Sequence, residues 1–144
     1  MIDIKQPLPL LGGLTPSRFM RRHWGKTPLL VRQAAPGITA PLARSELFAL
    51  ATREDVESRL VVREGRQWSL RQGPLPRRVL PPLSQPNWTL LVQGLDLHVD
   101  AAHALLSRFR FVPDARLDDA LVSSAADGGS VGPRTHARAN AARL

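Results

Sequence analysis

The chain has 144 residues, of which 43% are hydrophobic and 22% charged, and its formal net charge is +8 at pH 7. These values are typical of one globular domain, and no apolar run approaches the roughly 20 residues of a membrane span. Because the chain has no cysteine, disulfides, thiolate nucleophiles and zinc–thiolate sites are excluded. With no secretory signal pattern at the start, we expect a cytoplasmic protein.

The positive charge has two interpretations. A basic surface gains affinity for nucleic acid by releasing counterions from the phosphates. However, three of the charges (Arg134, Arg138 and Arg143) fall in the tail, and nearly all the basic residues are arginine. Since Arg, Ala, Pro and Gly are specified by GC-rich codons, the bias also fits genome composition. Nucleic-acid binding is therefore a secondary interpretation, not the favoured one.

Three elements are predicted in the first third of the chain. Thr15 followed by proline is a good helix start, and predicts a helix to about residue 24. Residues 29–31 form a short apolar run that predicts a buried strand. Ser45 is expected to cap a short helix through residue 52. That helix should bury Leu47, Phe48 and Leu50.

The middle of the chain gives the best hairpin signal. Residues 58–63 and 67–71 alternate between polar and β-branched or aromatic side chains, with a glycine turn between them. The proline-rich residues 73–86 are predicted to lack regular structure. Residues 88–93 form a near-continuous apolar run, typical of a strand that is covered on both faces.

The last third is predicted to contain one helix and one strand. Asp100 is expected to cap a helix over residues 101–109, and residues 116–125 are predicted to form a strand. A glycine-rich loop follows over residues 127–133. The tail from Arg134 onward has neither strand alternation nor a useful apolar face.

Several segments carry a family resemblance in their order and spacing. They are His23-Trp24-Gly25-Lys26-Thr27-Pro28-Leu29-Leu30, Ser58-Arg59-Leu60-Val61 with Trp68 and Gly73-Pro74, Asn87-Trp88-Thr89-Leu90-Leu91-Val92-Gln93, Arg116-Leu117-Asp118-Asp119, and Gly128-Gly129-Ser130-Val131-Gly132-Pro133. Together they resemble the front part of the bacterial JmjC-type, cupin-fold ribosomal oxygenases. That family consists of considerably longer proteins.

The resemblance implies a fold class and an activity. We expect an α+β fold, with a mixed lead-in and the start of an incomplete cupin/JmjC double-stranded β-helix. Residues 1–14 would be an N-terminal extension, 15–133 the N-terminal part of the JmjC/cupin domain, and 134–144 an unrelated Ala/Arg-rich tail. Full-length members are implied to use Fe(II) and 2-oxoglutarate to hydroxylate an arginine of a ribosomal protein.

The iron ligands implied by the family do not match this chain. In the family a His-x-Asp pair follows the Val-Gly-Pro of the glycine loop, and these positions are Arg134 and His136 here. A guanidinium stays protonated and has no lone pair for iron. We therefore expect no catalytic or metal-binding residues, no cofactor and no activity from this chain alone. The alternative is a small basic, non-catalytic module that binds ribosomal protein or RNA.

The loss of resemblance at one position has two explanations. A reading-frame shift in GC-rich DNA would produce an abrupt change followed by an Ala/Arg-rich tail. A truncated paralogue with a new tail is the competing hypothesis. A third hypothesis is that this chain forms an enzyme together with a second chain that carries the iron ligands.

Three acidic or histidine-containing motifs are candidate sites within the family-like region. Asp127 lies before the glycine loop, where the resemblance places the mouth of the barrel, and its carboxylate could meet a cationic substrate. A turn-forming role for Asp127 is the alternative. His98-Val99-Asp100 has His-x-Asp spacing but is expected to be structural. Asp118-Asp119 is not expected to form an acid–base pair, because adjacent strand residues point to opposite faces.

Overall fold

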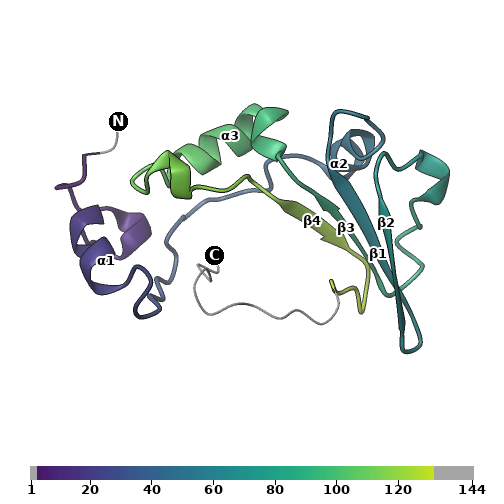
Figure 1. Ribbon diagram of the computed structural model, residues 1–144, viewed down its shortest axis with the longest axis horizontal. Coiled ribbons are helices and arrows are strands. Elements are labelled where there is room, and N and C mark those ends of the chain that lie inside the picture. Colours follow the sequence, from purple (N-terminus) through teal and green to yellow (C-terminus); the bar gives the residue numbers. More distant parts are fainter. Residues whose placement is uncertain (1–2, 132–144) are drawn as a thin grey trace. The chain divides into compact units, whose positions relative to one another are not determined.

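The computed structural model describes residues 3–131. Its architecture is mixed α+β, with four antiparallel strands in the order β2-β1-β3-β4 (Figure 1). The helices and strands are α1 (Pro16–Arg22), α2 (Arg44–Leu50), β1 (Ser58–Glu64), β2 (Gln67–Gln72), β3 (Trp88–Val92), α3 (Asp100–Ser107) and β4 (Val122–Ala125).

The described residues divide into two compact units. The α1 unit contains residues 3–39 and 108–117, and the sheet unit contains residues 40–107 and 118–131. In the α1 unit the ring of Phe19 stacks on His23 at 6.0 Å and meets the edge of Phe111 at 5.9 Å. This aromatic contact joins the two chain segments of the α1 unit.

The hairpin forms as predicted. β1 and β2 pair from Glu64–Gln67 at the turn to Arg59–Gln72 at the open end, so each strand is one residue longer than expected. Gly65 takes φ +60° in the turn, a conformation that glycine adopts without steric cost. All six residues of β2 are exposed, because β2 is an edge strand of the sheet.

The central strand is also confirmed. Every residue of β3 is buried, as expected for a strand with neighbours on both sides and cover on its faces. Trp88 is fully buried, packs against Phe48 of α2 with ring centroids 6.0 Å apart, and donates its indole N–H to the Pro82 carbonyl at 3.2 Å. The main core of the sheet unit therefore lies between α2 and one face of the sheet.

The helix starts were predicted with mixed success. Thr15 caps α1 by accepting a hydrogen bond from the Arg18 N–H, but the helix ends at residue 22 rather than 24. For α2 the expected Ser45 cap is wrong. The Ala43 carbonyl accepts the first helical bonds, and the Glu46 carboxylate accepts from the Ala43 N–H at 2.6 Å. The predicted buried residues of this helix, Leu47, Phe48 and Leu50, are confirmed.

Four other predictions are corrected. Residues 29–31 form no strand, and Leu30 is 78% exposed because no described strand pairs with it. The proline-rich segment contains a short 3-10 helix, Arg77–Val79. Asp100 is the first residue of α3 rather than its cap, since the Val99 carbonyl accepts the first bonds, and α3 ends at 107. Residues 116–125 form a strand only over β4, because just these residues pair with β3.

We expect the Trp88→Ala substitution to abolish cooperative unfolding. Truncating a large buried aromatic costs about 3–5 kcal/mol, which approaches the whole stability of many small domains. Urea titration followed by far-ultraviolet circular dichroism measures this loss. Trp68→Ala is the matched control, because Trp68 is 38% exposed, and it should keep a cooperative transition. Similar midpoints for the two variants would contradict the assignment of Trp88 to the core.

Candidate functional site

The candidate site is the glycine turn that follows β4. The Asp127 carbonyl accepts a hydrogen bond from the Asn87 N–H at 2.8 Å, and the Ala126 N–H donates to the Trp88 carbonyl at 3.1 Å. The Gly129 N–H closes the turn on the Ala126 carbonyl at 2.8 Å. These backbone bonds fix the turn to the residues at the start of β3.

Two glycines in the turn are required for different reasons. Gly128 takes φ +68°, which disfavours residues with a Cβ atom. At Gly129 a Cβ atom would lie 2.4 Å from the Trp88 carbonyl oxygen and 2.8 Å from that of Ala126. The backbone of the turn therefore approaches β3 as closely as it does because residue 129 has no side chain.

An arginine–asparagine pair lies beside the turn. Arg63 donates its backbone N–H to the Asn87 carbonyl at 2.8 Å and its guanidinium to the Asn87 side-chain oxygen at 2.9 Å. Asn87 has φ +65°, a conformation that asparagine tolerates better than most residues. The same guanidinium lies over the Trp68 ring, 5.7 Å from its centroid. We did not predict this cluster, although an asparagine directly before an apolar strand is a signal for such a turn.

Asp127 itself is exposed within the turn. Among residues 3–131 its carboxylate makes no hydrogen bond or ion pair, so the turn-stabilising role considered above is not seen there. An exposed, unpaired carboxylate can accept charge-assisted hydrogen bonds from a guanidinium or ammonium group.

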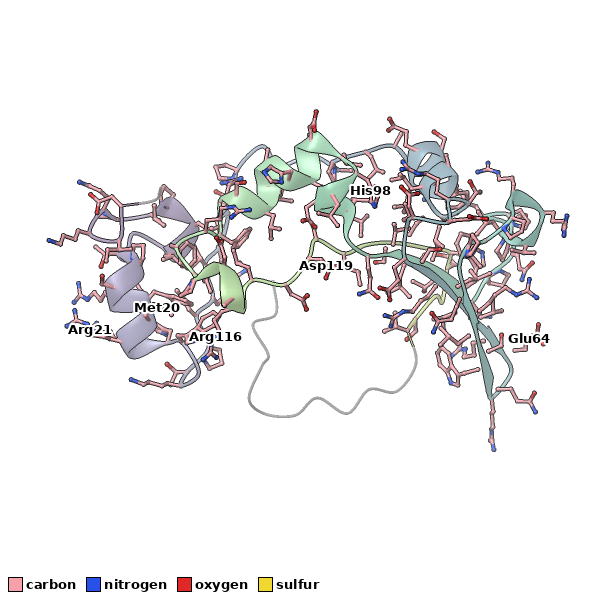
Figure 2. The ribbon with its side chains drawn as sticks, turned by 45° about the horizontal axis from the view of Figure 1, so that its top comes forward. Met20, Arg21, Glu64, His98, Arg116 and Asp119 are labelled. Atoms are coloured by element: carbon pink, nitrogen blue, oxygen red, sulfur yellow. The ribbon has the colours of Figure 1, made fainter. Side chains whose placement is uncertain are left out.

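The His98 motif does not form a metal site in the described part of the chain. Figure 2 shows His98 on the segment between β3 and α3, where it is half-buried, while Asp100 and His103 are exposed. Across residues 3–131 no three histidine, aspartate or glutamate side chains come together in a way that could hold a metal ion. The expected family positions, Arg134 and His136, lie outside the described residues.

The Asp118-Asp119 pair is structural, on a loop rather than on the predicted strand. Figure 2 shows Asp119 on the segment that leads into β4, and its carboxylate accepts from the Gly94 N–H. The Asp96 carboxylate accepts in return from the Ala120 N–H at 2.8 Å. Asp118 accepts from the N–H of its neighbour at 3.0 Å. These bonds hold two loops of the sheet unit together and leave no paired carboxylates for acid–base work.

One ion pair in the sheet unit shifts the protonation of its members. Arg53 donates to both carboxylate oxygens of Asp55, at 2.9 and 2.5 Å. This hydrogen bonding lowers the pKa of Asp55 and raises the pKa of Arg53. Any stability from the lowered pKa is present above the ordinary aspartate pKa and is lost as the pH falls through the lowered one. Both groups are fully exposed, so solvent screening keeps the effect small.

Comparison with known proteins identifies relatives of this chain. No family model matches it. The ribosomal protein uL16 3-hydroxylase of Escherichia coli is 36% identical over 115 residues, which cover 80% of this chain and 30% of the relative. A probable ribosomal oxygenase of Haemophilus influenzae is 35% identical over 120 residues, 83% of this chain and 30% of the relative. This chain is a partial homologue of the bacterial ribosomal oxygenases.

Solved structures of a ribosomal oxygenase agree with this relationship. The structure of YcfD from Escherichia coli matches with a TM-score of 0.74 and 35% identity, over 84% of this chain and 33% of YcfD. A complex of YcfD with cobalt and 2-oxoglutarate matches with a TM-score of 0.72, 34% identity and coverage of 83% and 32%. The resemblance found in the sequence motifs is confirmed. The chain spans about 30% of the length of the curated ribosomal oxygenases it matches.

No helix within residues 3–131 is long and apolar enough to cross a membrane. The helix α3, which has eight residues, is the longest of the described α-helices.

We expect Gly129→Ala to destabilise the sheet more than a substitution at an open glycine. The new methyl group must displace backbone atoms of β3 and of the turn, and overpacking of this kind costs about 1–3 kcal/mol in addition to any strain. Gly65→Ala is the control, because it also replaces a turn glycine but meets no atom within 4 Å. Urea midpoints of the two variants provide the comparison. Because Gly65 has φ +60°, its loss reports backbone strain alone, and an equal loss at both positions would show that the close approach at Gly129 costs no more than that strain.

Proposed function

We propose that this chain supplies the N-terminal framework of a ribosomal oxygenase and does not hydroxylate a substrate by itself. The observation that carries the proposal is a match of 35% identity and TM-score 0.74 to about one third of YcfD. The relative from Escherichia coli is named for hydroxylation of ribosomal protein uL16, so the partner we propose for the complete activity is that ribosomal protein.

The residues of this chain do not fit an iron site. Arg134 and His136 stand where the family pattern has histidine and aspartate, and arginine has no free lone pair for a metal. The described residues, 3–131, bring no alternative set of three ligand side chains together. A homologue, YcfD, has been solved with cobalt and 2-oxoglutarate.

We also propose that the four-stranded sheet is the opening part of a double-stranded β-helix. Thr89 and Leu91 of β3 point away from the α2 core, and the Thr89 hydroxyl is buried without a hydrogen-bond partner in the structure. On the same face, Leu70 of β2 is 59% exposed. Among the described residues, β2 and β4 have one open edge each. Additional strands at these edges would pair them and would cover the exposed Leu70.

Asp127 is the substrate-contacting residue we propose. Its exposed carboxylate stands on a turn fixed by four backbone positions, Asn87, Trp88, Ala126 and Gly129, and it makes no ion pair with the described residues. A guanidinium from a substrate arginine would form the bidentate pair that such a carboxylate favours.

The domain boundaries are also proposals. Residues 15–133 would be the family-like region, with 1–14 an extension and 134–144 of separate origin. Sequencing the gene through codon 133 and reading all forward frames tests the tail. A His-x-Asp and a long continuation in another frame would support a frameshift, and unrelated sequence in every frame would support a genuine tail.

We predict no hydroxylation when the purified chain is incubated with Fe(II), 2-oxoglutarate, oxygen and uL16. The measurement is the mass of the ribosomal protein together with succinate formation. The E. coli uL16 hydroxylase in the same mixture is the positive control. Addition of one oxygen atom to uL16 by this chain alone would refute the proposal.

We also predict marginal stability and self-association, because open sheet edges and uncovered apolar surface promote aggregation. Light scattering during a thermal ramp measures both properties. A monomeric chain that melts cooperatively at high temperature would count against the need for further strands.

A further inference from the structure

The charge of the chain is distributed unevenly between its two units. The described residues of the α1 unit include nine arginines and lysines and two acids, Asp3 and Asp114, and nine minus two gives +7. The described residues of the sheet unit include eight arginines and ten acids, which gives −2. The sequence-wide value of +8 therefore conceals one strongly basic unit and one weakly acidic unit.

The centre of the positive charge is the face of α1 that carries three arginines. Arg21 and Arg22 come three and four residues after Arg18, so both are neighbours of Arg18 on the helix surface. All three side chains are exposed. Together with Thr15 they line an open concavity of about 570 Å³. Figure 2 shows Arg21 projecting from α1. We name this surface the arginine face.

The acids of the α1 unit do not neutralise the arginine face. Asp114 pairs with Arg110 at 2.9 Å, and the Asp3 carboxylate accepts from the Lys5 backbone N–H at 2.9 Å. Among residues 3–131 no carboxylate lies within ion-pair distance of the three arginines. Lys26 adds a further cation beside them, since its ammonium donates to the Arg21 carbonyl at 2.7 Å. An anionic ligand would relieve the repulsion among these like charges.

The chemistry of this surface fits a phosphate backbone. Arginine forms paired hydrogen bonds to phosphate oxygens, and seven of the nine basic residues in the unit are arginines. The aromatic ring of α1, Phe19, is already engaged within the unit, because it packs against His23, Trp24 and Phe111. Contact of the arginines with the backbone of a duplex is therefore favoured over stacking of Phe19 on unpaired bases.

We propose that the arginine face binds the phosphate backbone of double-stranded RNA without reading its sequence. The choice of RNA as the source of the phosphates rests on the proposed link to ribosomal oxygenases. The binding surface itself does not depend on that link.

The test is a titration of a short fluorescein-labelled RNA duplex with the full chain over a series of salt concentrations. Each phosphate contact contributes about 0.9 to the slope of log K against log salt. The variant R18Q/R21Q/R22Q should lower this slope by about 2–3 and weaken binding at low salt by about tenfold or more. R66Q/R71Q/R78Q is the matched control, because it removes the same charge from exposed positions of the sheet unit and should leave the slope unchanged.

A further variant separates loss of charge from loss of folding. R18K/R21K/R22K keeps the three charges and should retain the salt slope, and circular dichroism checks that each variant is folded. Equal weakening by the two glutamine variants would overturn the proposal, because net charge rather than the arginine face would then control binding. Tighter binding of a DNA duplex would overturn the choice of RNA. Tighter binding of poly-L-glutamate than of RNA at equal charge would overturn nucleic acid in favour of an acidic protein partner.

Discussion

The burial of β3 is the constraint on which the sheet unit depends. β3 lies between β1 and β4, and its Trp88 side chain fills the space beneath α2. Its backbone also positions the candidate site, since the Trp88 carbonyl accepts from Ala126 and the preceding Asn87 accepts from Arg63 and donates to Asp127. The core and the glycine turn are thus fixed by the same short segment, so a change that shifts β3 alters both.

The elements that could be predicted are those whose signals are local. The β1–β2 hairpin follows from alternation around a glycine turn, and β3 follows from an uninterrupted apolar run. The strand predicted at residues 29–31 was wrong because no described strand pairs with these three apolar residues, and Leu30 is left exposed. The strand predicted over residues 116–121 was wrong for the same reason, since pairing with β3 begins only at Val122.

The candidate site was predictable only in part. The loop character of Asp127 and its glycines can be derived from composition. The contact between Arg63 and Asn87 cannot, because it joins residues 24 positions apart and requires the register of β1 on β3. The hydrogen bonds of Asp119 and Asp96 are likewise invisible in sequence, because their partners are backbone N–H groups of other loops. The uneven distribution of charge between the two units could not be predicted from the sequence either. The two segments that make up the α1 unit are far apart in the chain.

The three tryptophans give the molecule a built-in optical label for each unit. The chain contains no tyrosine, so its intrinsic ultraviolet emission comes from indole rings alone. Trp24 belongs to the α1 unit, whereas Trp68 and Trp88 belong to the sheet unit and differ in exposure, at 38% and 0%. Iodide should quench Trp68 and leave Trp88 bright and blue-shifted. With Trp24 and Trp68 replaced by phenylalanine, the remaining emission would report on the interior of the sheet unit alone.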